Sequence, residues 1–483
     1  MAVGGAHRPF LPAEAVAECY VALREDVEAC AAHNTGKLPT HHESGQDFAS
    51  LVQETFPPFL VAGLGMVGAG ILLGHVKHLA VFQEVGELLI LVPPLLGLKG
   101  NLEMTLASRL STHANLGHLD SKDVFFDIAV GNLAAVQCQA IIVGFLAAVV
   151  ACALNLFTTG DMNLSHLSLM AASSVGAASW ASLLLALIMI GIIVFSRRMG
   201  VDPDNIASPI AGMLGDLVTL SILSTISFFL YSTQEDYWWL QFAVLGGYAL
   251  VAPLCCMIAS RIEYTAEVVK EGWVPVIAAM LISSAGGTIL KHADKVFRNL
   301  APFAPVMNGA GGNLAAVQTS RICTDLHLNG EPGHAVLRRK LLAVEKHVPE
   351  EEELEPLTPP ATLTGLMSSN EHAGVARVLI CLTIPGSLIF ASLIVRVQSG
   401  GVAFPKPCFL ALFIGAALVQ VAFLILFAHG IVNRLWLNGS NPDNSAIPYV
   451  TSLGDVVGTT CLTGAFCLLA WLGGAPFTIE GMP

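Results

Sequence analysis

The chain has 483 residues, of which 54% are hydrophobic and only 12% are charged, and its mean hydropathy is +0.68. Soluble domains carry about 25% charged residues, so this composition excludes a soluble globular protein. The net charge of −13 excludes a nucleic-acid-binding protein, and the composition also excludes a collagen, a coiled coil and a disulfide scaffold. We therefore predict an all-α polytopic membrane protein.

Apolar runs long enough to cross a bilayer as helices recur along almost the whole chain. About eleven such spans are predicted, at residues 56–76, 86–110, 127–156, 166–196, 206–231, 237–260, 273–290, 298–322, 375–396, 407–432 and 445–472. Several spans are rich in Gly, Ala and Ser, which let helices pack closely in lipid. The short alternating segments of a β-barrel do not occur in the sequence.

Residues 1–55 and 324–374 are polar and acidic, and they carry most of the net negative charge. With the N-terminus in the cytosol, the cytosolic loops hold clearly more Lys and Arg than the loops on the other side, as the positive-inside rule requires. We therefore predict a cytosolic N-terminus, a cytosolic 324–374 segment and a C-terminus outside the cytosol. The plasma membrane is the predicted location, and the inner mitochondrial membrane is the alternative.

The two halves of the chain share two blocks of sequence in the same order. Pro93-Pro-Leu-Leu-Gly-Leu-Lys-Gly-Asn101 recurs 212 residues later as Pro305-Val-Met-Asn-Gly-Ala-Gly-Gly-Asn313. Asp202-Pro-Asp-Asn-Ile-Ala-Ser-Pro209 recurs 239 residues later as Asn441-Pro-Asp-Asn-Ser-Ala-Ile-Pro448. Each second block is followed by Leu-Gly-Asp, which ends at Asp216 in the first half and at Asp455 in the second. These matches predict a duplicated five-helix unit.

The duplication predicts how the chain is divided. The first repeat spans residues 56–231, a linker helix lies within 232–272, and the second repeat spans 273–472 with the acidic insertion 324–374. Residues 1–55 and 473–483 form the two tails. Because one unpaired span separates two five-helix units, the repeats should be parallel and related by a pseudo-two-fold axis along the membrane normal. One chain should then contain a complete pathway, so we expect a monomer to be sufficient.

Asp216 and Asp455 are the strongest functional candidates, because an ionisable residue inside a membrane is costly. The ten residues from Ile206 to Asp216 rise about 15 Å, which places the carboxylate near the middle of the bilayer. Gly212, Asp216 and Thr219 share one helix face, and so do Thr451, Asp455 and Gly458. These small residues would let two helices approach while both carboxylates point towards one axis. A structural hydrogen bond to a neighbouring helix is the alternative explanation for each aspartate.

Two facing carboxylates repel, and a divalent cation between them would relieve the repulsion. Oxygen ligands suit a hard cation such as Mg²⁺, which keeps much of its hydration shell. Asn101 and Asn313 follow glycines that weaken the helix, so their amide oxygens are further candidate ligands. Close helix packing through these glycines is the alternative. Mg²⁺ is expected as the transported substrate, and no cofactor is expected.

The two copies differ at Lys99 and Glu103, which become Gly311 and Ala315 in the second repeat. Lys99 and Glu103 are four residues apart and could pair on one helix face, so that each neutralises the other. Alternatively, they tune the occupancy of the cation site or its coupling. Asp127, at the start of the third span, is a further candidate for such tuning.

The Pro-x-x-x-Gly-x-Gly-Gly-Asn element, followed by the Pro-Asp-Asn block and an in-helix Gly-Asp, resembles the membrane domain of the MgtE magnesium transporters. Two copies in one chain resemble the solute carrier 41 family, over roughly residues 56–472. The resemblance implies magnesium transport, with Asp216 and Asp455 at the family's ion-binding aspartate on the fifth helix. Lys99 departs from the motif, which has glycine at that position.

The sequence favours magnesium transport over two other membrane functions, proteolysis and transport of an organic solute. An intramembrane aspartyl protease also uses two membrane aspartates, but its Gly-x-Gly-Asp signature would need glycine where Met213 and Ser452 stand. An organic-solute carrier would need aromatic or Arg contacts in mid-membrane, and the chain has only six Trp and six Tyr. We therefore predict a transporter and not an enzyme. Na⁺-coupled Mg²⁺ efflux and an uncoupled Mg²⁺ channel remain the two mechanistic alternatives.

Overall fold

The computed structural model describes residues 48–115, 122–159, 164–199, 203–271, 273–297, 299–329, 371–440 and 442–473. These residues form helices and turns and contain no β-strand. Most of the predicted acidic N-terminal tail, acidic insertion and C-terminal tail lies outside the described residues. The all-helical architecture predicted from the sequence is confirmed for the part of the chain that the structure describes.

The first group of helices contains one short helix and five long ones. They are α2 (Phe48–Val76), α3 (Ala80–Glu84), α4 (Leu88–Asn115), α5 (Lys122–Thr159), α6 (Leu164–Met199) and α7 (Pro203–Thr233). Two helices, α8 (Trp239–Arg261) and α9 (Glu263–Glu271), follow them. The second group is α10 (Trp273–Val296), the 3₁₀ turn η2 (Ala301–Phe303), α11 (Ala304–Asn329), α14 (Glu371–Gln398), α15 (Pro407–Leu437) and α16 (Pro442–Trp471).

Within the described residues, nine helices are long and apolar enough to cross a membrane. The two predicted spans that do not meet this criterion correspond to α4 and α11, of which α4 has only the shorter apolar segment Leu88–Leu98. Both helices carry the Gly-Asn motifs, so their composition is more polar than that of the other spans. They also pack against several neighbouring helices, which shields them from lipid and makes a uniformly apolar surface unnecessary.

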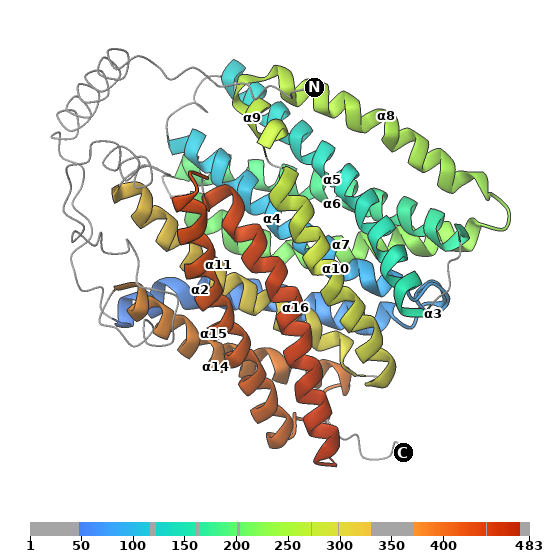
Figure 1. Ribbon diagram of the computed structural model, residues 1–483, viewed down its shortest axis with the longest axis vertical. Helices are drawn as coiled ribbons and strands as arrows, with labels where there is room; N and C mark the ends of the chain where they lie inside the picture. The colour runs from blue at the N-terminus through green and yellow to red at the C-terminus, as the bar shows by residue number, and fades with distance from the viewer. Residues whose placement is uncertain are drawn as a thin grey trace, which may run out of the picture. The chain divides into compact units, whose positions relative to one another are not determined.

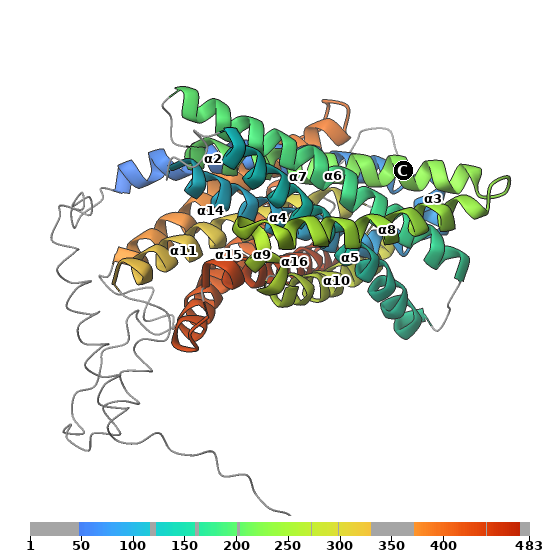
Figure 2. The same ribbon diagram turned by 90° about the horizontal axis from the view of Figure 1, so that it is seen from above.

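The packing within the second group has a counterpart in the first. In the first group, α2, α4 and α6 all pack against α7. In the second group, α10, α11 and α15 all pack against α16, and α10 runs alongside α16 in both views (Figure 1 and Figure 2). Within each group, the last helix therefore packs against the three corresponding long helices.

The first helix of each group also packs against the other group. Helix α2 contacts α11 and α14, and α10 contacts α4 and α5. A Cβ atom at Gly70 of α2 would overlap the carbonyl oxygen of Pro302, and one at Gly287 of α10 would overlap that of Ile90. Pro302 follows Ile90 by 212 residues, the same spacing as the repeated motif. In each group, a glycine of the first helix therefore packs closely against a backbone carbonyl of the other group.

Two ionic contacts join the end of α10 to the first group, one at the end of α2 and one just before α4. Lys77, just after α2, places Nζ 2.8 Å from Oδ1 of Asp294 in the last turn of α10. Lys291 in α10 places Nζ 3.7 Å from Oε1 of Glu87, which precedes α4, and Asn155 bridges the two side chains. Because the carboxyl ends of α2 and α10 meet, the two helices end on the same side of the bundle.

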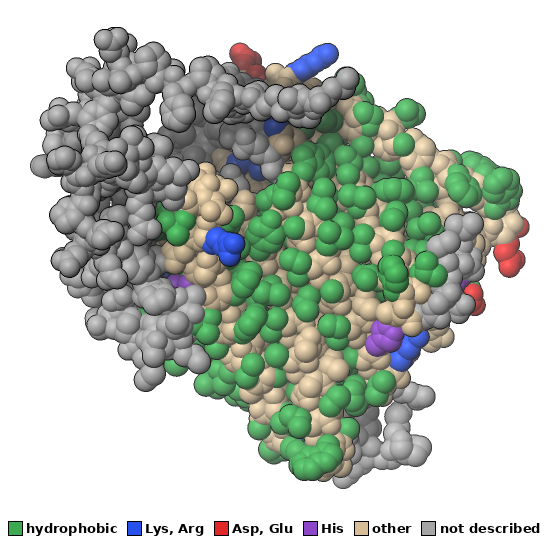
Figure 3. Space-filling view, in the orientation of Figure 1, with side chains coloured by type: hydrophobic (Ala, Val, Ile, Leu, Met, Phe, Trp, Pro, Cys, Tyr) green, Lys and Arg blue, Asp and Glu red, His purple; other side chains and the backbone are tan. Residues whose placement is uncertain are grey.

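Helix α8 lies along the edge of the bundle in Figure 1 and packs against α5, α6 and α9. Only 11% of its candidate span is buried, and Phe242, Leu250, Leu254 and Met257 are exposed along it. On the face seen in Figure 3, hydrophobic side chains also cover much of the described surface and charged ones are few. Such a surface is suited to lipid and not to water.

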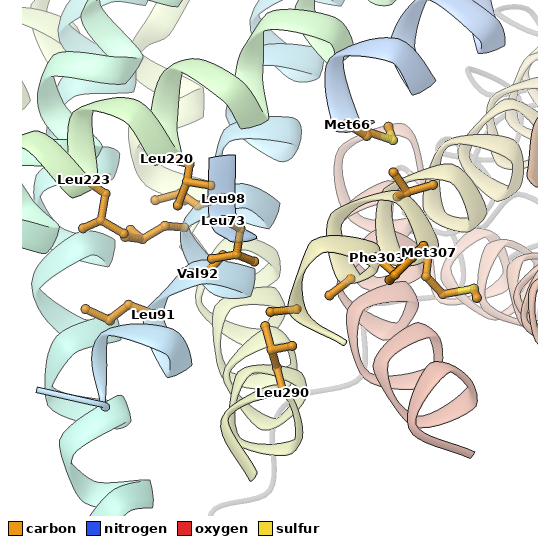
Figure 4. Packing of buried hydrophobic residues seen from close by; sticks show 14 of the residues in the cluster. Met66, Leu73, Leu91, Val92, Leu98, Leu220, Leu223, Leu290, Phe303 and Met307 are labelled. Atoms are coloured by element: carbon orange, nitrogen blue, oxygen red, sulfur yellow. The ribbon is translucent and has the colours of Figure 1, made fainter. Parts of the chain in front are cut away.

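The main hydrophobic core combines side chains from both groups. Met66 and Leu73 come from α2, Leu290 from α10, and Phe303 and Met307 from η2 and α11. Figure 4 shows these side chains together with those of α4 and α7. The two groups of helices therefore share one main hydrophobic core.

Candidate cation site

A cavity of about 80 Å³ lies between the two groups of helices. Its described lining consists of Met66, Leu73, Val92, Pro93, Leu96, Gly97, Glu103, Gly215, Asp216, Leu290, Ala304, Pro305, Asn308, Gly309, Gly312, Asn313, Thr451 and Asp455. Matching motif positions from both halves contribute, such as Pro93 with Pro305 and Gly97 with Gly309. The two repeated blocks of the sequence therefore meet around one space.

Asp216 and Asp455 both line this cavity. Helices α7 and α16 begin at Pro203 and Pro442, where proline is tolerated because the first turn has no hydrogen-bond partner for its missing N–H. Each aspartate comes thirteen residues after that proline, so both lie about 20 Å along their helices.

Asp455 is held by a neighbouring helix of its own repeat. The side chain is 8% exposed, and Ser283 of α10 donates a hydrogen bond of 2.5 Å from Oγ to its Oδ2 atom. A Cβ atom at Gly97 of α4 would lie 3.0 Å from the same Oδ2 atom and 3.1 Å from Ser283 Oγ. Glycine at position 97 therefore lets the first repeat approach the carboxylate of the second.

Further polar residues line the cavity from the second repeat. Asn313, Asn308 and Thr451 are all part of its lining. The Thr451 hydroxyl donates to the carbonyl oxygens of Ile447 and Pro448 in its own helix, at 3.0 and 3.2 Å. No Lys or Arg occurs among the described residues that line the cavity. The site therefore combines negative charge with neutral oxygen donors.

Some residues predicted from the sequence lie elsewhere. Thr219 is fully buried, and its hydroxyl donates to the carbonyl oxygen of Gly215 at 2.7 Å without lining the cavity. Asp127 is exposed on α5 and is also absent from the lining. Three further predicted residues belong to α4 and α7, but their surroundings lie outside what the structure describes: Lys99, Asn101 and Gly212.

Two residues that were not predicted from the sequence also belong to the site, one in the cavity lining and one bonded to Asp455. Ser283 and Asn308 are the clearest cases, since one binds Asp455 and the other lines the cavity. Asn308 lies inside the repeated motif, and Ser283 belongs to a Ser-Ser pair within an apolar helix. Either feature is a signal in the sequence, but neither indicates which carboxylate the side chain would meet.

The donor set fits a hydrated cation better than a dehydrated one. Among the described residues, no three His, Cys, Asp or Glu side chains are gathered closely enough to hold a metal ion. Two aspartates on the walls of one cavity can instead attract a cation that keeps its water, with the neutral oxygens binding those waters. Mg²⁺, which dehydrates reluctantly, has this property.

Comparison with known proteins agrees with the duplication. The family model described as "MgtE: Divalent cation transporter" matches residues 92–226 and 304–465. The two matches begin at positions 212 residues apart, and each ends beyond the aspartate of its repeat. No solved structure matches this chain.

Several curated relatives match most of the chain. Solute carrier family 41 member 2 of Gallus gallus is 45% identical over 86% of this chain and 70% of its own length. Member 3 of Mus musculus is 43% identical over 86% of this chain and 82% of its own length, and member 2 of Homo sapiens is 44% identical over 91% and 73%. The chain therefore belongs to the solute carrier 41 family and contains two segments of the MgtE divalent cation transporter type.

Proposed function

We propose that this protein transports Mg²⁺ across a membrane through the cavity between its two repeats. The observation that supports this most strongly is that Asp216 and Asp455, from different repeats, line the same cavity. Membership of a divalent cation transporter family supports transport as the activity and argues against the protease alternative. The specific choice of Mg²⁺ rests on the chemistry of the donors.

The proposed mechanism uses charge and not tight ligation. Asp216 and Asp455 attract the cation and neutralise its charge where the bilayer would otherwise oppose it. Asn308, Asn313 and Thr451 accept hydrogen bonds from, or replace, waters of the hydration shell. Since few direct ligands hold the ion, it can leave the site as readily as it enters, which conduction requires.

We also propose that one chain is a complete transport unit with two parallel repeats. The matching contacts of α7 and α16, and the meeting of the carboxyl ends of α2 and α10, support this arrangement. The Lys and Arg bias of the loops supports a cytosolic N-terminus and a cytosolic 324–374 segment, with the C-terminus on the other side of the plasma membrane. Epitope tags at the N-terminus, within residues 324–374 and at the C-terminus test this topology in intact cells. An N-terminus and a C-terminus on the same side of the membrane would contradict it.

Transport is tested with purified protein in liposomes that contain a Mg²⁺-sensitive dye. We expect Mg²⁺ flux from the unmodified chain and loss of most of that flux in D216N and D455N. E235Q, which removes an exposed carboxylate after α7, is the matched control and should transport normally. Normal flux in both aspartate variants would show that these carboxylates are structural and that the pathway lies elsewhere.

The same liposomes separate the two mechanistic alternatives. If transport is Na⁺-coupled efflux, an inward Na⁺ gradient should drive Mg²⁺ out against its own gradient. If the protein is a channel, Mg²⁺ should move only down its electrochemical gradient, whatever the Na⁺ gradient. Flux at a protein density of one chain per vesicle tests whether the monomer is sufficient, and flux restricted to vesicles with two or more chains would contradict it.

A further inference from the structure

The cavity receives a third carboxylate from the first repeat only. Glu103 of α4 lines it together with Asp216 and Asp455, and the side chain is 1% exposed. The matching residue in the second repeat is Ala315, which is packed among Leu424, Ala428 and Val450. A charge could not be accommodated in that apolar cluster, so the difference between the repeats is built into their packing.

Glu103 is directed towards the neighbourhood of Asp216. A Cβ atom at Gly215, the residue before Asp216, would lie 3.2 Å from Oε2 of Glu103. The carboxylate of α4 therefore approaches the backbone of α7 beside one of the two aspartates. On the other side of the cavity, Asp455 has the hydroxyl of Ser283 as its neighbour, and Ala315 stands at the position that matches Glu103.

Resting on the proposed function, we infer that Glu103 is a specificity-determining residue of the cation site, which favours a divalent over a monovalent cation. Three carboxylates raise the negative potential of the cavity, and that potential acts twice as strongly on a doubly charged ion. Because no three acidic side chains converge to hold a bare ion among the described residues, Glu103 acts on the hydrated cation through its field and through water.

The extra carboxylate of Glu103 makes the cation site asymmetric although the two repeats are similar. The cation is attracted more strongly to the wall formed by α4 and α7 than to the wall formed by α16. A site with only Asp216 and Asp455 would bind a divalent cation more weakly and would discriminate less against the monovalent ions that are abundant around it. Glu103 should therefore affect the KM for Mg²⁺ more than the maximal flux.

The test measures Mg²⁺ flux in liposomes as a function of Mg²⁺ concentration for E103Q, which keeps the shape and removes the charge. We expect the KM for Mg²⁺ to rise about tenfold, which corresponds to about 1.4 kcal/mol, with maximal flux largely kept. Inhibition of Mg²⁺ flux by added monovalent cation should become stronger. E103D, which retains the charge, should restore most of the affinity, and E235Q serves as the control for loss of a distant carboxylate.

The competing explanation is that Glu103 only neutralises Lys99, four residues earlier in α4. The double variant K99M/E103Q removes both charges and separates the two roles. No lysine remains to be neutralised in K99M, so if Glu103 acts on the cation, K99M/E103Q should have a KM several-fold above that of K99M. Equal KM values for K99M and K99M/E103Q would overturn the inference.

Failure of this inference is distinguishable from failure of the proposed function. If D216N and D455N lose flux while E103Q keeps an unchanged KM, the cavity is the pathway but Glu103 is not part of its specificity. If E103Q lowers maximal flux and leaves the KM unchanged, its role is structural and the inference is wrong. If D216N and D455N both transport normally, the proposed function itself fails.

Discussion

The hydroxyl of Ser283 donates a hydrogen bond of 2.5 Å to Oδ2 of Asp455 and so connects the first and last helices of the second repeat. Gly97 of the first repeat lies close to the same carboxylate. One aspartate is thus positioned by its own repeat and approached by the other. This arrangement explains how two similar repeats can form one site.

Replacing Ser283 with alanine should weaken Mg²⁺ transport. A hydrogen bond to a charged group contributes about 1.5–3 kcal/mol, so loss of the hydroxyl should leave the Asp455 carboxylate poorly oriented. We expect the KM for Mg²⁺ to rise by at least about tenfold. The control is S284A, because the Ser284 hydroxyl bonds to the carbonyl oxygen of Met280 in its own helix. Equal effects of the two substitutions would contradict a specific role of Ser283.

The two aspartates should behave as one functional unit. D216N and D455N each leave a divalent ion with one fewer carboxylate, at a cost of several kcal/mol, as when a buried ion pair loses a partner. Because both act on one cation, the double variant should be little worse than either single variant. N313A should transport better than either, since water can replace an amide oxygen. Initial Mg²⁺ flux at equal protein amounts measures all four variants, and strictly multiplicative losses in the double variant would indicate two independent sites.

Adding one methyl group at Gly97 should impair transport through crowding at Asp455. The new Cβ would lie 3.0 Å from Oδ2 and 3.1 Å from Ser283 Oγ, closer than ordinary van der Waals contact. We expect G97A to lower flux while the protein keeps its folded, monodisperse form in detergent. G415A is the control because a Cβ at Gly415 meets no atom within 4 Å. Unchanged flux in G97A would mean that the cavity widens freely at this point.

Removing one partner of the Lys77–Asp294 pair should destabilise the protein. The two side chains are 7% and 12% exposed, so K77M leaves a largely buried carboxylate without this cation, at a cost of about 3–5 kcal/mol. The double variant K77M/D294N removes both charges and should recover part of the loss. Thermal unfolding in detergent measures the effect, with K295M as an exposed control. Equal destabilisation by K77M and K295M would show that the pair contributes nothing.

Much of the architecture follows from the sequence alone. Apolar length predicts where membrane helices occur, and nine of the described helices have the required length and composition. The repeated motifs identified Asp216 and Asp455 as equivalent residues, and helical rise places both at the same distance along their helices. They also carry the resemblance to the solute carrier 41 family, which the comparisons confirm.

Only the tertiary structure decides which side chains meet. Helical periodicity predicts that Asp216 and Thr219 share a face, yet Asp216 lines the cavity and Thr219 does not. It could not predict that Ser283 meets Asp455, because 172 residues separate them and only the packing of α10 against α16 brings them together. Glu103 and Lys99 are neighbours in sequence, but the position of Glu103 beside Gly215 depends on how α4 packs against α7. Local sequence determines the depth and face of a side chain, whereas its partners are set by long-range contacts between helices of both repeats.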